Sequence, residues 1–170
     1  MNYKVEAILI LLNNDCILER YYPLIPFKND IVKKLKDSNI NTKEEAFKAN
    51  SLLNEFFNDD YLTNLFKRFL NMYEVNKSKL KEIQKIDLND EERESFKELY
   101  LLPGVKETRA RLYYLSGLKS LSDVANKSVN EIISLTNNKI SLMKLECKAP
   151  LEKEARTHIS VAKVLTEYSA

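Results

Sequence analysis

The fold of this chain is decided by the stretch from Glu98 to Val124, which reads ELYLLPGVKETRARLYYLSGLKSLSDV. The chain contains only two glycines, Gly104 and Gly117, and both lie in this stretch. Glycine is used where the backbone needs a positive φ or where another group must approach it closely. A chain this poor in glycine places each one for a reason, so the stretch predicts a helix, a tight turn, and a second helix with a defined end.

The residues around the two glycines give the limits of these helices. Pro103 disfavours helical geometry at the residue before it, so the preceding helix should end there. A helical pattern resumes over Lys106 to Ser116, and Gly117 stands where a left-handed residue terminates a helix. Ser120 is a suitable N-cap for a further short helix. The local prediction is helix, hairpin turn, helix, capped stop and helix.

This pattern resembles a known motif. The segment Leu102-Pro103-Gly104-Val105, followed by the small Ala110 and the apolar Tyr113, is similar to the helix-hairpin-helix motif. That motif usually carries a second glycine two positions after the first, where this chain has Lys106. Hairpins of this type bind phosphate through backbone N–H groups at a helix N-terminus, and the resemblance implies that chemistry here.

The resemblance extends toward the C-terminus. Residues 117–125 and the pair Glu131-Ile132 are similar to tandem helix-hairpin-helix domains, among them an uncharacterised bacterial family of that superfamily. It covers roughly residues 89–170. Tandem domains of this type imply a second hairpin, for which the segment Lys148 to Leu151 is the candidate, although it has no glycine.

The functional hypothesis is a phosphate-binding hairpin. Gly104 would let a phosphate approach the backbone, and the N–H groups of Val105, Lys106 and Glu107 would donate to it, aided by the helix dipole. Such contacts carry no base information, so binding of DNA or RNA would be largely independent of sequence. The predicted nucleic-acid-binding residues are Gly104, Val105, Lys106, Arg109, Arg111 and Lys119.

A second hypothesis makes the hairpin purely structural. Lys106 and Arg109 would then form a solvated face diluted by Glu107, and the chain would be a protein-interaction or scaffold module. Tyr113 and Tyr114 could stack on bases of a single strand, but at least one of them should lie in the core.

Composition is that of a globular protein and excludes a disordered one: 44% of the 170 residues are hydrophobic and 31% are charged. The net charge of +2 does not by itself indicate a polyanionic partner. The charge is divided unevenly, because residues 1–99 carry 16 basic and 18 acidic side chains, whereas residues 100–170 carry 11 and 7. The basic excess falls on the half with the hairpin.

No motif indicates an enzyme, a cofactor or a metal site. Cys16 and Cys147 are too few for a disulfide framework, and His158 is the only histidine. His158 with Glu154 one turn earlier could be a general base, but an exposed helical ion pair is the preferred interpretation. The apolar run Ala7 to Leu12 is too short for a membrane span, so we expect a cytoplasmic protein that binds no membrane.

The remaining sequence predicts helices, and hence an all-α fold. Residues 1–88 should form an N-terminal helical bundle, including a helix over the run Ala7 to Leu12, packed on a helix-hairpin-helix domain of residues 89–170. A capping box at Thr42 to Glu45 should open one long helix that ends before Asn58-Asp59-Asp60, and Leu62 to Tyr73 should form the next. The Phe-rich faces of these two helices are assigned to the core rather than to a ligand pocket.

The C-terminal part has its own signals. Ser128 to Glu131 is a second capping box. Thr136 to Ser141 is polar and is predicted to be a loop, with a short turn of helix at Leu142 to Leu145. Leu151 to Tyr168 should be a long final helix.

Overall fold

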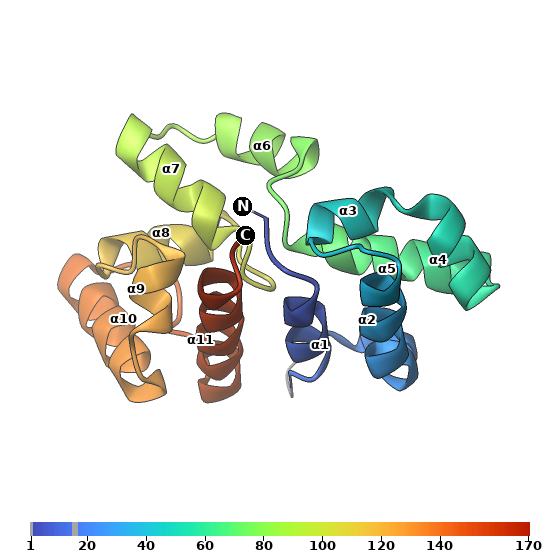
Figure 1. Ribbon diagram of the computed structural model, residues 1–170. Coiled ribbons are helices and arrows are strands. Elements are labelled where there is room, and N and C mark those ends of the chain that lie inside the picture. The colour runs from blue at the N-terminus through green and yellow to red at the C-terminus, as the bar shows by residue number, and fades with distance from the viewer. Residues whose placement is uncertain (1, 15–16) are drawn as a thin grey trace. The chain divides into compact units, whose positions relative to one another are not determined.

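A computed structural model describes residues 2–14 and 17–170 (Figure 1). Within these ranges the chain forms eleven α-helices and one 3₁₀ helix, and its only β-type pairing is two isolated bridges. The all-α prediction is therefore confirmed. Cys16 lies outside the described residues.

Two compact units make up the chain. The first comprises the residues up to Glu74 together with Glu167–Ala170, and the second is Val75–Thr166. This division comes earlier than the boundary expected between residues 88 and 89. The reason is Arg93, whose guanidinium donates to the carbonyls of Ile83 at 2.9 Å and Leu88 at 3.2 Å. These bonds fasten the helix before the expected boundary to the helix after it.

The first unit is a bundle of short helices closed by both chain ends. The N–H of Lys4 donates to the carbonyl of Tyr168 at 2.8 Å, and the N–H of Ala170 donates to that of Asn2 at 3.0 Å. The predicted helix over the apolar N-terminal run is present as α1. The elements are α1 (Glu6–Leu12), η1 (Glu19–Phe27), α2 (Lys28–Asp37), α3 (Lys43–Lys48), α4 (Asn50–Phe57) and α5 (Asp60–Met72).

Local capping signals set two of the helix starts of this unit, those of α3 and α5. The Thr42 side chain accepts from the N–H of Glu45, and the Asp59 side chain accepts from that of Leu62. The prediction of one long helix from the capping box is wrong, because the helix is interrupted at Ala49 (φ −85°, ψ 58°), which separates α3 from α4.

The core of the first unit is aromatic. Phe66 and Phe69 are fully buried, and the Phe69 ring meets Tyr21 and Tyr73 edge-on at centroid distances of 5.3 and 5.4 Å. Such edge-to-face pairs are favourable. Their burial supports the interpretation of the Phe-rich stripe as core.

A buried lysine also belongs to this unit. Lys43 is 2% exposed, contacts the Glu74 carboxylate, and places its Nζ 6.0 Å from the ring centroid of Tyr3. Burial lowers the pKa of Lys43, because it disfavours the charged form. Tyr3 is fully buried, and among the described residues its hydroxyl has no hydrogen-bond partner.

The second unit contains the predicted hairpin. Ser128 and Glu131 form the predicted capping box at the start of α10, the 15-residue helix Val129–Met143. That helix runs through the segment 136–141, so the predicted loop there is wrong. The elements are α6 (Lys77–Gln84), α7 (Asp90–Leu99), α8 (Glu107–Leu115), α9 (Leu121–Ala125), α10 (Val129–Met143) and α11 (Glu152–Glu167).

Packing in this unit fixes α8 between α7 and α10. Ala110 and Tyr113 of α8 are fully buried. Gly117 follows α8 at φ +85°, and the N–H of Leu118 reaches back to the carbonyl of Tyr113 at 2.8 Å. This is the helix stop predicted from Gly117.

Candidate functional site

The turn that joins α7 to α8 is built around Gly104. This residue has φ +75°, and the N–H of Val105 donates to the carbonyl of Leu102 at 3.2 Å. Gly104 is exposed and Val105 is buried. A Cβ added at Gly104 would meet no atom within 4 Å. Glycine is therefore favoured here by the backbone conformation and not by lack of space.

The N-terminus of α8 has no side-chain cap. Lys106 takes the cap position in extended conformation, and its side chain accepts no hydrogen bond from the first turn. An α-helix leaves the N–H groups of its first turn without partners in the helix, here those of Glu107, Thr108 and Arg109. Four other helix starts of this unit differ: α6, α7, α9 and α10 are capped by Asn76, Asn89, Ser120 and Ser128.

An open pocket of about 480 Å³ lies at this helix start. Two exposed lysines, Lys106 and Lys148, approach it from the two segments that flank it. Three carboxylates also line it, so its charge is mixed. The lining residues are Gly104, Lys106, Glu107, Thr108, Arg109, Glu146, Cys147, Lys148 and Glu154.

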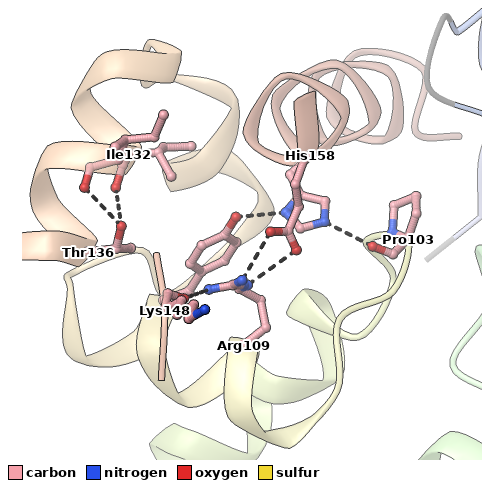
Figure 2. A network of polar contacts seen from close by, with 9 residues as sticks. Pro103, Arg109, Ile132, Thr136, Lys148 and His158 are labelled. Carbon is pink, nitrogen blue, oxygen red and sulfur yellow. Dashed lines mark hydrogen bonds and ion pairs between the residues drawn. The ribbon is translucent and has the colours of Figure 1, made fainter. Parts of the chain in front are cut away.

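Arg109 forms part of the pocket wall and is held by two partners (Figure 2). Its Nε and Nη2 donate to the two oxygens of Glu154 at 3.3 and 3.0 Å, and its Nη1 donates to the carbonyl of Lys148 at 2.7 Å. Only 19% of its side chain is exposed. Fork-shaped pairing of this kind is directional and strong. Arg109 therefore connects α8 to α11 and is not a free cation.

Arg111 and Lys119 are paired with helix α7. Arg111 lies 3.4 Å from a Glu92 oxygen, and its guanidinium covers the Phe96 ring at 5.6 Å. Lys119 lies 3.1 Å from Glu91, whose pKa is lowered by that hydrogen bond. These pairings mean that the predicted basic residues do not form one uninterrupted basic face.

Lys106 is the most exposed of the predicted cations. Its side chain is 77% exposed, and its Nζ lies 3.8 Å from the Glu82 carboxylate. An ion pair at that distance on the surface is weak and screened by salt. Lys106 is thus the predicted cation that remains most available to a ligand.

His158 is part of a buried polar network behind the pocket (Figure 2). Its Nε2 lies 2.9 Å from the carbonyl of Pro103, and its Nδ1 lies 2.7 Å from the Tyr113 hydroxyl. A carbonyl only accepts, so Nε2 carries the proton and Nδ1 accepts from the tyrosine. The expected exposed ion pair of His158 with Glu154 is therefore wrong: His158 is 1% exposed and Glu154 binds Arg109.

The contacts between α8 and α11 share a fixed offset. Arg109 binds Glu154 and Tyr113 binds His158, and the two members of each pair are 45 positions apart. The two carbonyls that complete the network, those of Pro103 and Lys148, are separated by the same number of positions. The turn before α8 supplies the Pro103 carbonyl to His158 of α11, and the segment before α11 supplies the Lys148 carbonyl to Arg109 of α8. The turn with α8 and the segment with α11 thus form two halves of one network. The segment 148–151, considered as a second hairpin from the sequence, occupies the equivalent place before α11.

No family model, curated protein or solved structure matches this chain.

No helix in residues 2–14 and 17–170 is both long and apolar enough to cross a membrane. In the same ranges no three His, Cys, Asp or Glu side chains are grouped so that they could hold a metal ion.

The pocket brings together only part of the predicted set. Gly104 and Lys106 border it, Arg109 forms its wall, and Val105 is buried beneath the turn. Arg111 and Lys119 instead pair with α7. Thr108 and Lys148 were missed by the sequence analysis. The implied second hairpin at 148–151 was the one signal that pointed to Lys148.

Proposed function

We propose that this protein binds nucleic acid without catalysis, through a backbone phosphate at the N-terminus of α8. The main support for the proposal is that the start of α8 has no side-chain cap and lies at a pocket lined by two exposed lysines. Free N–H groups and the positive end of a helix dipole together favour an anion. Because such a site contacts phosphate and not bases, binding is largely independent of sequence.

The proposal gives each residue a distinct role. Gly104 keeps the turn open to an approaching phosphate, and the N–H groups of Glu107 and Thr108 donate to its oxygens. Lys106 and Lys148 add attraction over a longer range. Arg109 positions the two sides of the pocket and does not itself bind the ligand. This arrangement is consistent with a helix-hairpin-helix motif formed by α7 and α8.

The pocket's carboxylates and the ion pairs around it limit the affinity. With about one or two phosphates neutralised, Kd should be on the order of 10⁻⁴ to 10⁻⁶ M at physiological salt. The logarithm of the binding constant should fall with the logarithm of salt concentration, by roughly 0.9 per phosphate on duplex DNA.

Two substitutions at one position test the backbone donor. Glu107→Ala removes a negative charge and keeps the N–H, whereas Glu107→Pro removes both. Proline is tolerated at the first helical position, and the extended conformation of Lys106 suits a following proline. In fluorescence anisotropy with duplex DNA, Glu107→Ala should bind at least as tightly as wild type, and Glu107→Pro about tenfold more weakly than Glu107→Ala. Equal affinity of the two variants would contradict donation by this group.

A charge-reversal pair tests the lysines. Lys106→Glu/Lys148→Glu should weaken binding and flatten the salt dependence, with unchanged helical circular dichroism. The control Lys33→Glu/Lys34→Glu makes the same change in net charge on exposed residues of α2. If the control weakens binding equally, only net charge matters and the hairpin site is wrong.

An interaction module is the second candidate. It is favoured by three exposed apolar side chains at the end of α10 and before α11: Leu142, Met143 and Leu151, exposed by 77%, 48% and 78%. Absence of any nucleic-acid binding at low salt would end the first proposal. In that case Leu142→Lys/Leu151→Lys should reduce self-association or partner binding in analytical ultracentrifugation, and an unchanged profile would contradict the module as well.

A further inference from the structure

A second pocket lies in the first unit, between α3 and α5. Its volume is about 300 Å³, and it is open to solvent. It is lined by Phe47, Asn64, Lys67, Arg68 and Asn71. None of these lining residues is acidic, whereas the pocket at the start of α8 includes three carboxylates.

The four polar residues of this pocket come from one face of α5. Positions 64, 67, 68 and 71 follow the spacing of three and four that places side chains on one side of a helix. Tyr61, which is 61% exposed, lies one turn before Asn64 on the same side. From Tyr61 to Asn71 the helix rises by roughly 15 Å, at 1.5 Å per residue. The face is thus longer than one small ligand needs.

The two cations of the pocket differ in how they are held. Lys67 is half-buried, contacts the Asn50 side-chain oxygen, and places its Nζ 5.4 Å from the Phe47 ring centroid. It is therefore fixed in position without being neutralised by a carboxylate. Arg68 is exposed, and it forms no ion pair with any residue that the structure describes. Both charges remain available to an anion.

The acidic residues before and after α5 in the sequence do not line this pocket, and neither does Glu44 of α3, which pairs with Lys48 at 2.9 Å. Asp59 accepts from the N–H of Leu62 as the cap of α5, and Asp60 lies in the first turn, outside the lining. Glu74, beyond the end of α5, is paired with the buried Lys43.

We propose that this pocket binds a nucleotide unit of a single-stranded nucleic acid. Lys67 and Arg68 contact the phosphate, and the ring of Phe47, 37% exposed, stacks on the base. The carboxamides of Asn64 and Asn71 each offer donors and an acceptor, as the edge of a base requires. A basic groove combined with an aromatic platform is the arrangement that binds single strands. This site is separate from the hairpin and does not depend on the function proposed for it.

The strand is favoured over a free nucleotide by the length of the α5 face. Successive nucleotides in a duplex strand rise by about 3.4 Å, so roughly 15 Å of helix accompanies more than one nucleotide. Tyr61 then offers a second aromatic ring one turn away from the pocket.

The absence of tryptophan from the sequence permits a local reporter. Phe47→Trp introduces the only tryptophan, directly at the proposed stacking position. Titration with oligothymidylate should quench its fluorescence in a saturable way. The matched reporter is Tyr22→Trp, at an aromatic position of η1 that is 48% exposed and outside the pocket. Equal quenching of both reporters, or none at Phe47→Trp, would overturn the proposal.

Side-chain variants distinguish the two parts of the contact. Lys67→Gln/Arg68→Gln and Phe47→Leu should each weaken oligothymidylate binding by about tenfold, the range for a lost stacking or charge contact. Tyr22→Leu is the control for the aromatic change and should have no effect. An abasic oligonucleotide should bind Phe47→Leu and wild type equally. If it binds wild type as tightly as oligothymidylate does, the base-stacking assignment is wrong.

Two further measurements test whether this site is independent of the hairpin and whether its ligand is a strand. Quenching at Phe47→Trp should persist in the Glu107→Pro background, because the two sites lie in different units. Thymidine monophosphate should bind more weakly than the strand at equal nucleotide concentration. If the monophosphate binds equally well, the pocket takes a free nucleotide and the assignment to a strand is overturned.

Discussion

The Tyr113 hydroxyl donates to Nδ1 of His158 across 2.7 Å, and the imidazole that accepts this bond is buried inside the protein. Burial lowers the pKa of His158, and the Pro103 carbonyl and Glu154 offset part of that effect. Arg109, which binds Glu154, lowers the pKa further. Protonation would remove the acceptor on Nδ1 and place a charge where solvent cannot reach it.

The first prediction follows from the sign of this shift. The unfolded chain binds a proton near the ordinary histidine pKa, and the folded chain binds it only at lower pH. The stabilising effect of the neutral ring is therefore complete above about pH 6.5 and declines as pH falls below it, by at most about 1.4 kcal/mol per pH unit. Urea unfolding at about pH 7.5 and about pH 5.5 measures the decline.

Because His158 is the only histidine, the control is direct. His158→Gln should be less stable overall but should lose the histidine-dependent difference between these two pH values. Tyr113→Phe should reduce the difference, since Nδ1 no longer has a donor to lose. An equal difference in His158→Gln and wild type would show that other groups cause it.

The second prediction concerns the pair between α8 and α11. Arg109→Glu should destabilise the protein by about 2 kcal/mol, since it breaks charged hydrogen bonds and places two carboxylates together. Arg109→Glu/Glu154→Arg should recover part of that loss in thermal unfolding. If the double variant is as unstable as the sum of the single ones, the two residues do not act as a pair.

Much of the local structure could be predicted from the sequence. The capping residues Thr42, Asp59 and Ser128 each mark a helix start within a few residues of themselves. The two glycines mark both positive-φ turns around α8. These features depend on interactions between neighbours in sequence, which is why a single sequence is enough to find them.

Other features depend on contacts that the sequence does not display. The polar segment 136–141 is helical although its composition indicates a loop: Thr136 is fully buried, and its hydroxyl is satisfied by the carbonyl of Ile132 at 2.7 Å. The position of Arg109 one turn after Lys106 predicts a phosphate contact, whereas its partner Glu154, 45 positions away, leaves no sign in the local sequence. Helical periodicity contains no information on such pairings.

The third prediction concerns the turn. Gly104→Ala should destabilise the second unit by about 1–2 kcal/mol, the cost of a left-handed conformation for a residue with a Cβ. Gly104→Asn should cost less, because asparagine tolerates this conformation. Since no atom lies within 4 Å of the added Cβ, the loss should come from the backbone alone. Equal stability of all three proteins in thermal unfolding would contradict the positive φ.

The fourth prediction is that a side-chain cap at the start of α8 raises the stability of the protein and lowers its affinity for DNA. Lys106→Ser supplies the side-chain cap that this helix lacks, which should stabilise the protein by about 1 kcal/mol. The serine hydroxyl would then occupy an N–H group that the proposal assigns to phosphate, so DNA affinity should fall. Lys106→Ala, which removes the charge without adding a cap, is the comparison. If the serine variant binds at least as well as the alanine one, the N–H groups are not the ligand's donors.

The fifth prediction concerns the unpartnered hydroxyl of Tyr3. An unsatisfied buried polar group costs about 1–3 kcal/mol, so Tyr3→Phe should leave stability unchanged or raise it. Tyr73→Phe, at the neighbouring buried tyrosine, is the comparison. A marked loss of stability in Tyr3→Phe alone would show that the hydroxyl has a partner.

Helices α8 and α11 carry different side chains at positions related by the offset of 45 residues. This difference affects which helix each of them can pair with. Glu154 stands where the first half has Arg109, and His158 stands where it has Tyr113. If α8 of one molecule met α8 of another in the same way, two guanidinium groups would face each other with no counter-ion. Two α11 helices would likewise bring two Glu154 carboxylates together. The mismatch between the two helices therefore opposes pairing of two copies of the same helix and favours the pairing of α8 with α11.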